Sequence, residues 1–217
     1  MCVKEIIDIK SSYMKGRERK GPKEEQSRAT QERLLGAARA LFSERGFAGT
    51  ATEDLVARAG VTRGALYHQY VDKRDLFRAV FEDVERQLGE RIGAAAAAES
   101  DPWEMIRAGA RALLEASLEP AVRRIVLTDG PSVLGWEEWR RIDAQYAYGM
   151  VRVALEANME SGNLPRLAIE PFTHLIIGAL NEAGLAVAAS RTPEKTRDEF
   201  LATLDGVLTA LRAAARR

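Results

Sequence analysis

Apolar residues recur at helical spacing along most of this 217-residue chain, and few segments show the alternation of a strand. The chain is also rich in Ala, Leu, Glu and Arg, which favour helices. We therefore predict an all-α protein of about nine helices. The expected helices span about 30–45, 50–59, 62–70, 72–98, 103–118, 120–129, 136–161, 170–190 and 193–212.

Turn residues separate the later helices, with Ser-Asp-Pro at 100–102, Asp-Gly-Pro at 129–131 and Gly-Asn-Leu-Pro at 162–165. The first expected helix has one continuous apolar stripe, which predicts that this face packs on a core. The stripe consists of Leu34, Leu35, Ala38, Leu41 and Phe42.

Two short helices joined by a glycine turn are predicted between residues 50 and 70. Thr50 as N-cap and Glu53 three positions later form the pattern of a capping box. Gly60 stands where a helix commonly ends in a left-handed residue, and Thr62 has the side chain of a second N-cap. The residues expected to face inward are Leu55, Val56, Ala59, Leu66 and Tyr70. Together these features predict a helix-turn-helix.

The first turn of the second short helix carries chemistry suited to DNA. Gly64 inside a helix costs about 1 kcal/mol relative to Ala, so close approach of a ligand to the backbone would explain it. Arg63 could donate two hydrogen bonds to a guanine, and the Tyr67 hydroxyl could reach a phosphate. Asp72 is expected to cap the next helix, and Lys73 adds a charge at that helix amino end. A helical hairpin with ordinary caps and a solvated basic face is the alternative.

An ordered series of segments resembles the TetR family of one-component transcriptional repressors. The resemblance covers ERLLGAARALFSERGFAGT at 32–50 and DLVARAGVTRGALYHQYVDKRDLF at 54–77, roughly the first third of the chain. This chain has Tyr67-His68-Gln69 where the family commonly has two aromatic residues before the His. The resemblance implies phosphate contacts from Thr52, Thr62, Tyr67 and Lys73, and base or near-base contacts from Arg63, Gly64 and His68.

The formal net charge is zero, but residues 1–80 hold 16 Lys and Arg against 11 Asp and Glu, and residues 81–217 hold 16 against 21. A basic amino-terminal part suits a polyanion. We divide the chain into a flexible basic arm (1–27), a helix-turn-helix DNA-binding domain (28–78) and a helical effector-binding and dimerisation domain (79–217). The arm is expected either to enter a minor groove or to be a disordered leader kept soluble by its charge.

The last two helices carry the predicted dimer interface. Small residues on the first would let another helix approach closely, and Leu residues recur at helical spacing on the second. Two copies would then form a four-helix bundle, which the family resemblance also implies. The predicted contact residues are Gly178, Ala179, Ala183, Ala186, Leu204, Leu208 and Leu211. The alternative is that both helices complete a monomeric core.

The resemblance also implies a small-molecule effector site among the helices of the second domain. Aromatic side chains are common in apolar ligand cavities, and His174 and Asn181 share one helix face. The candidate ligand-binding residues are Trp103, Trp136, Trp139, Tyr146, Met150, His174 and Asn181. Each of them could instead be an ordinary core residue.

The sequence contains few residues that commonly act in catalysis or bind metals: it has two His, one Cys (Cys2) and no recognisable catalytic or metal-binding motif. We therefore expect neither an enzyme nor a bound metal or cofactor. No apolar run approaches the about 20 residues that span a bilayer, so we expect a cytoplasmic protein without a membrane partner. Together with these features, the resemblance to the TetR family implies a homodimeric repressor that binds a palindromic double-stranded DNA operator and is released by a small molecule. The alternative is a helical small-molecule-binding protein without operator-specific DNA binding.

Overall fold

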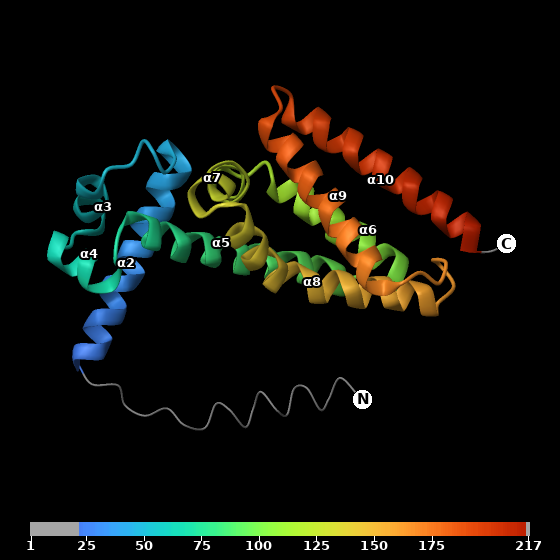
Figure 1. The fold of residues 1–217 in the computed structure, drawn as a ribbon, viewed down its shortest axis with the longest axis horizontal. Coiled ribbons are helices and arrows are strands. Elements are labelled where there is room, and N and C mark those ends of the chain that lie inside the picture. Colours follow the sequence, from blue (N-terminus) through green and yellow to red (C-terminus); the bar gives the residue numbers. More distant parts are fainter. Residues whose placement is uncertain (1–21, 216–217) are drawn as a thin grey trace.

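The computed structural model describes residues 22–215, which form helices and no strand within that range (Figure 1). The helices are α2 (Pro22–Arg45), α3 (Thr52–Ala59), α4 (Arg63–Gln69), α5 (Lys73–Ala97), α6 (Pro102–Ala116), the π-helical η1 (Val122–Asp129), α7 (Gly130–Leu134), α8 (Trp136–Glu160), α9 (Ile169–Ala189) and α10 (Pro193–Ala215). We call α2, α3 and α4 the head, and α6 to α10 the body; α5 runs from one to the other. The all-α prediction is confirmed.

The first helix of the head begins earlier than the apolar pattern predicts. Its first turn contains Glu24 and Glu25, whose charges favour a helix amino end, and a proline is well tolerated at the first position. The Ser27 hydroxyl accepts a hydrogen bond from the side-chain amide of Gln69 at 2.7 Å. Residues 22–27, predicted as part of a flexible arm, are therefore helical. The rest of that arm lies outside the described residues.

A second boundary also differs, because the Asp-Gly-Pro segment at 129–131 does not end its helix. η1 continues directly into α7, and Pro131 occupies the first turn of α7, where a missing N–H costs little. The helix ends only at Gly135, whose φ of 84° favours glycine.

Three caps were predicted in the head, and two of them are confirmed. The Thr62 hydroxyl accepts the Ala65 N–H at 3.1 Å, and the Asp72 carboxylate accepts the Asp75 N–H at 2.7 Å. The capping box at Thr50 was wrong. Its hydroxyl is buried and donates to the backbone oxygen of Gly46 at 2.7 Å, while α3 starts after Ala51 without a side-chain cap.

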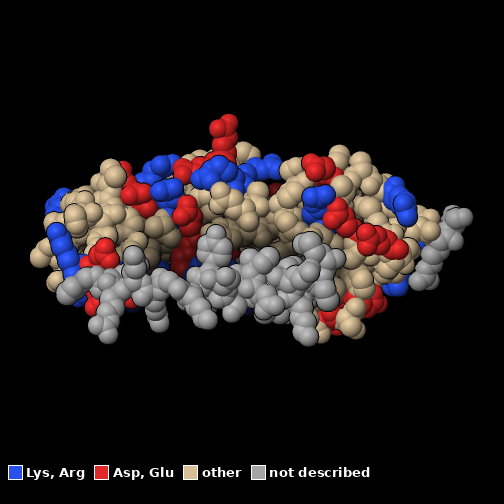
Figure 2. Space-filling model, turned by 90° about the horizontal axis from the view of Figure 1, so that it is seen from below, with Lys and Arg blue, Asp and Glu red and all other residues tan. Residues whose placement is uncertain are grey.

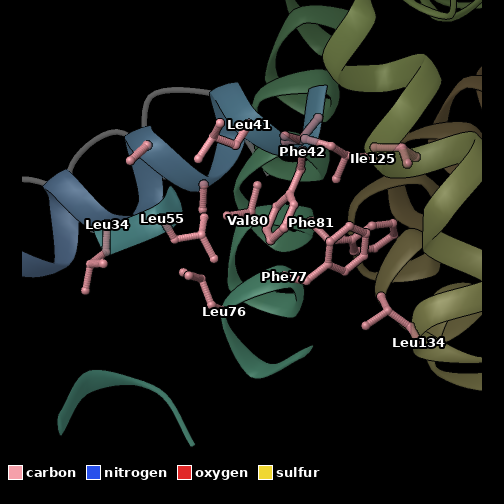
Figure 3. Close-up of a cluster of buried hydrophobic side chains, with 14 of the residues drawn as sticks. Leu34, Leu41, Phe42, Leu55, Leu76, Phe77, Val80, Phe81, Ile125 and Leu134 are labelled. Atoms are coloured by element: carbon pink, nitrogen blue, oxygen red, sulfur yellow. The ribbon is translucent and has the colours of Figure 1, made fainter. Parts of the chain in front are cut away.

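One continuous apolar core joins the head to the body (Figure 3). Phe42 on α2 and Phe77 on α5 are fully buried, and their rings meet edge-on with centroids 5.2 Å apart. The same cluster extends along α5 to Phe81 and reaches Ile125 on η1. Because protein interiors are closely packed, a shift of α5 or η1 is transmitted to the helices of the head.

Polar contacts reinforce this junction. The Asp129 carboxylate accepts the Phe47 N–H at 2.7 Å, which ties the loop after α2 to the end of η1. The Arg74 guanidinium donates to the backbone oxygens of Val133 (3.0 Å) and Leu134 (2.9 Å) on α7. The middle and the carboxyl end of the η1–α7 segment are thereby attached to the loop after α2 and to the first turn of α5.

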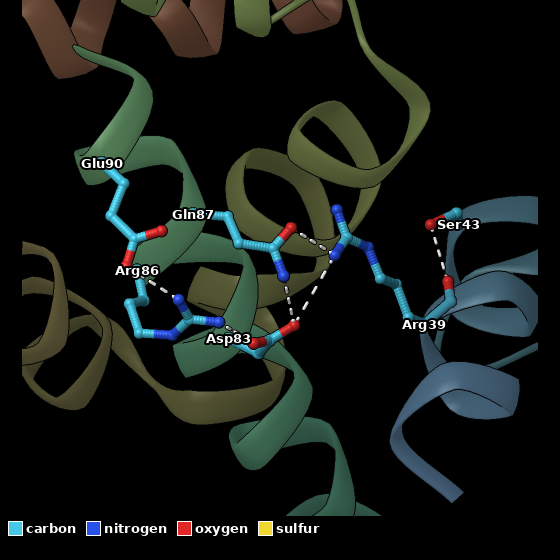
Figure 4. A network of polar contacts seen from close by, with 6 residues as sticks. All are labelled: Arg39, Ser43, Asp83, Arg86, Gln87 and Glu90. Carbon is cyan, nitrogen blue, oxygen red and sulfur yellow. Dashed lines mark hydrogen bonds and ion pairs between the residues drawn. The ribbon is translucent and has the colours of Figure 1, made fainter. Parts of the chain in front are cut away.

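A side-chain network also fixes α2 to α5 (Figure 4). Arg39 on α2 donates to the side-chain oxygen of Gln87 at 2.6 Å and lies 3.6 Å from the Asp83 carboxylate. Arg86 then bridges Asp83 and Glu90 along α5, at 2.6 and 2.8 Å. Because these side chains are half-exposed, the pairs add little to the stability of the protein. We infer that they mainly fix the orientation of α2 relative to α5.

The body is a bundle in which α5 packs on α6 and α8, and α9 packs on α6, α8 and α10. A second core cluster lies there, centred on Trp103, Leu155 and Phe172. By length and composition alone α9 could span a bilayer, but it contacts four other elements of the chain. A single helix of this kind is weak evidence for a membrane, because core helices of bundles have the same composition.

Candidate DNA-binding surface and effector cavity

The amino end of α4 lies on the surface of the head. Arg63, Gly64, Tyr67 and His68 are exposed, whereas Leu66 is fully buried on the opposite face. The helix is thus anchored by its apolar side and presents its polar side to the solvent, as a helix that enters a DNA groove must.

The packing of residues 22–215 around Gly64 does not require a glycine. Its φ is not positive, and a Cβ at this position would meet only the Thr62 hydroxyl, at 3.9 Å. An Ala would therefore fit, and it would favour the helix by about 1 kcal/mol. Close approach of the α4 backbone to a ligand would explain the glycine.

Arg63 is held in place by its neighbours. Its guanidinium forms an ion pair with Glu53 at 3.0 Å and lies 5.6 Å from the centroid of the Tyr67 ring. Glu53, predicted to cap α3, is thus the partner of the residue predicted to read a base. Both side chains are largely exposed, so the pair is weak and can open when Arg63 meets DNA.

The ammonium group of Lys73 has a structural role that the sequence did not reveal. It donates to the backbone oxygens of Phe47 and Thr50, each at 2.9 Å, and lies 4.1 Å above the Phe47 ring. These bonds satisfy carbonyls in the turn between α2 and α3. One of three N–H donors remains for a phosphate, so the predicted contact stays a prediction.

The other two residues predicted to bind phosphate lie in the first turns of their helices. Thr62 is exposed and uses its hydroxyl as the N-cap of α4, and Thr52 is half-buried at the start of α3. Both positions are close to helix amino ends, where backbone N–H groups favour anions. Their contacts with DNA stay predictions.

Charge on the head is more balanced than the first 80 residues suggest. Residues 22–80 contain ten basic and eight acidic side chains, so most of the basic excess falls on residues 1–21. Several head arginines are paired with acids, as in Arg45 with Asp54 and Arg58 with Glu44. Figure 2 likewise shows blue and red side chains interspersed over the face seen from below.

A cavity of about 430 Å³ lies in the body between α5, α6, α8, α9 and α10. Its wall is almost entirely apolar. Three of the predicted ligand-binding residues line it: Tyr146, Met150 and Asn181. Gly89 on α5 lets α8 approach, because a Cβ there would lie 3.3 Å from the Tyr146 Cβ. This size and lining are typical of small-molecule sites.

The other four predicted ligand-binding residues do not line this cavity. Trp139 is 1% exposed, and its indole N–H donates to the Val126 backbone oxygen at 3.0 Å, so it belongs to the core. Trp103 is buried in the second core cluster. Trp136 and His174 are exposed on the surface. Aromatic content alone did not reveal which face of each helix borders the cavity.

Two acidic cavity residues were missed. Glu85 on α5 is 3% exposed, and its Oε1 has no hydrogen-bond partner among the described residues. Burial, aided by the nearby Asp143 carboxylate, raises the pKa of Glu85 to about 8. Burial also raises the pKa of Asp143, although that carboxylate accepts a hydrogen bond from Asn181 at 2.8 Å. The signal was present in the sequence, since Glu85 lies on the buried stripe of Phe81 and Leu88.

The predicted dimer residues divide between two faces. Leu208 is buried and Leu204 and Leu211 pack against the second core cluster, so the stripe on α10 faces the body of its own chain. Ala183 is also buried, and Ala186 is half-buried. Gly178 and Ala179 on α9 are exposed, and a Cβ on Gly178 would meet nothing. Among the seven predicted contact residues, these two are the ones that lie fully exposed.

Two family descriptions match the chain. Residues 34–80, which contain the second half of α2, all of α3 and α4 and the start of α5, match the family described as bacterial regulatory proteins, tetR family. Residues 103–211, half of the chain, match the tetracyclin repressor-like C-terminal domain. The chain belongs to the TetR family. It is a DNA-binding transcriptional regulator.

Individual relatives agree with this assignment over most of the chain. A TetR-family transcriptional regulator from Pectobacterium atrosepticum, of known crystal structure, is 34% identical with a TM-score of 0.77, covering 86% of this chain and 95% of its own. The Tn10 TetC protein of Escherichia coli is 22% identical over 90% of this chain and 98% of its own. The regulator AcrR of Shigella flexneri is 32% identical over 48% of each chain.

Proposed function

We propose that this TetR-family protein is a repressor that binds a palindromic operator as a homodimer and leaves it when a small molecule occupies the body cavity. The observation that carries the DNA-reading role is the exposed amino end of α4, where none of the described neighbours of Gly64 requires a glycine. Arg63 beside it has the donors to read a guanine edge. Thr52, Thr62, Tyr67 and Lys73 would hold phosphates, and His68 would lie near the bases.

A dimer explains how one short helix can specify an operator. Each copy would read one half-site, and two half-sites one helical turn apart are separated by about 34 Å. The exposed face of α9, with Gly178, Ala179 and Leu175, is the surface we assign to the partner copy. At a twofold interface both copies would use this same surface.

Release by a ligand follows from the position of α5. This helix carries Phe77 in the shared core, and it lines the cavity from Glu85 to Ala97. A molecule that fits the cavity better when α5 is displaced would favour a dimer whose heads no longer match adjacent major grooves. We infer a regulator without catalytic activity that acts in the cytoplasm, as other members of the family do.

Selection from a random pool of duplexes tests this proposal. The full-length protein should retain duplexes with two inverted half-sites, and its affinity for them should fall steeply with salt because phosphate contacts release counterions. Retention without any enriched sequence would instead support a helical small-molecule-binding protein that lacks operator recognition.

A further inference from the structure

The polar groups of the cavity lie at one end. Glu85 is the first cavity residue along α5, and Asp143 is the first along α8. From there the cavity follows α5 as far as Ala97, about 18 Å at the rise of an α-helix, with only apolar side chains and glycines from that helix. An elongated molecule with one polar end and one apolar end would match this distribution.

The charge of the polar end has one sign. The titratable side chains on the cavity wall are Glu85 on α5 and Asp143 and Tyr146 on α8, while α6, α9 and α10 contribute none. Among residues 22–215, no Lys, Arg or His lines the cavity. Burial raises the pKa of Asp143, and the charge of the nearby Arg140 offsets only part of that rise. Such a wall rejects an anionic group and favours a cation or a hydrogen-bond donor.

The protein's own groups leave Glu85 poorly satisfied. It is 3% exposed, and its Oε1 has no hydrogen-bond partner among residues 22–215. A buried carboxyl without a partner costs free energy and stays protonated instead of ionising. The same group can release its proton and form a strong charge-assisted hydrogen bond when a cation enters.

We propose that the effector is an amphipathic organic cation, whose protonated nitrogen binds between the Glu85 and Asp143 carboxylates and whose apolar part lies along α5 and α8. This inference rests on the proposed function only for its consequence at the DNA. On binding, the N–H groups of the ligand donate to the carboxylate oxygens, and the proton of Glu85 passes to the solvent. The positive charge of the ligand thus balances the negative charge that Glu85 gains when it loses its proton.

Three molecules that share one apolar chain provide the probe: octylamine, octanol and octanoate. Titration calorimetry on the full-length protein at pH 7, without DNA, should give the order octylamine tighter than octanol, and octanol tighter than octanoate. Octylamine should also release protons, detected as a heat that depends on the ionisation enthalpy of the buffer. Equal affinities for octylamine and octanol, or no proton release, would overturn the proposal.

Substitutions assign the preference to the carboxyls. The Glu85→Gln variant should fold, because the amide resembles the protonated acid. Its affinity for octylamine should be lower by about tenfold or more, while its affinity for octanol should change by less than about twofold. Glu90→Gln, on the exposed face of the same helix, is the matched control and should change neither affinity. Octylamine binding that is the same in Glu85→Gln and the native protein would contradict the assignment.

A parallel measurement on DNA separates this inference from the proposed function. Octylamine should lower the affinity of the native protein for its selected operator and should leave that of Glu85→Gln nearly unchanged. If octylamine binds as expected but does not affect DNA binding, the release mechanism fails while the ligand class stands. If DNA is released by octanoate as effectively as by octylamine, the ligand class fails.

Discussion

At the junctions of the head, polar side chains bond to backbone atoms of neighbouring segments, whereas in the body cavity two carboxyls face apolar walls. Lys73 satisfies two carbonyls of the α2–α3 turn, and Asp129 satisfies the N–H of Phe47. Glu85 has an oxygen with no partner among the described residues. In the head, these bonds fix the positions of the helices relative to one another. In the cavity, a bound molecule could give the buried carboxyl of Glu85 the hydrogen-bond partner that it lacks among the described residues.

Glu85→Gln should give the largest change in stability of the four substitutions, and this change should depend on pH. Because the pKa of Glu85 is about 8 in the folded protein and near 4.5 when unfolded, its contribution is most favourable below pH 4.5 and is lost as the pH rises to about 8. Between pH 4.5 and 8, the free energy of unfolding of the native protein should therefore fall by up to about 4 kcal/mol relative to that of the variant. Urea unfolding at several pH values measures this. A constant difference between the two proteins would contradict the burial of this acid.

Lys73→Met should give the next largest effect, and in the head. Two charge-assisted hydrogen bonds and a contact with the Phe47 ring are lost, so the free energy of unfolding should fall by about 2–3 kcal/mol. Lys195→Met removes an equal charge from an exposed position and should change stability by less than about 0.5 kcal/mol. Similar urea midpoints for both variants would show that Lys73 is not a structural tie.

Asp129→Ala tests the bond between head and body. The Phe47 N–H would lose its acceptor, and we expect a loss of about 1–2 kcal/mol. Hydrogen exchange should speed up at Phe47 while α8 and α9 keep their protection. Ser132→Ala, whose exposed hydroxyl bonds only to a nearby carbonyl, is the control. An unchanged exchange rate at Phe47 would show that the hydrogen bond from its N–H to Asp129 does not hold the loop after α2 in place.

Gly64→Ala should have the smallest effect on stability and still impair DNA binding. The variant should be equally stable or up to about 1 kcal/mol more stable, because alanine favours the helix and nothing obstructs its Cβ. Operator affinity should nevertheless fall. Gly36→Ala on α2, also unobstructed, should gain similar stability and keep its DNA affinity. If both variants bind DNA as the native protein does, Gly64 does not approach a ligand.

The same comparison explains what the sequence could predict. Short-range signals worked: the helical periodicity, the Thr62 and Asp72 caps and the apolar stripe of α2 all depend on residues a few positions apart. Thr50 was misassigned because its true acceptor, the Gly46 oxygen, became available only through the turn between α2 and α3. Local pattern could not distinguish these two bonds.

In the body the limits were of a different kind. Trp139 and Tyr146 lie on one helix, yet one is a core residue and the other a cavity residue, because different neighbours cover their faces. Helix packing decides this, and it involves residues far apart in the sequence. Glu85 could have been noticed as an acid on an apolar stripe, and such a position is a reason to look for a ligand.

The central claim is that the amino end of α4 reads base edges, and repeating the duplex selection with Arg63→Ala tests it most directly. The account predicts that the variant still enriches inverted half-sites, but that one position in each half-site loses its preference, with a loss of about 1–3 kcal/mol on the native operator. If the native protein and the variant select the same sequence with the same affinity, Arg63 does not read DNA and the account of α4 is wrong.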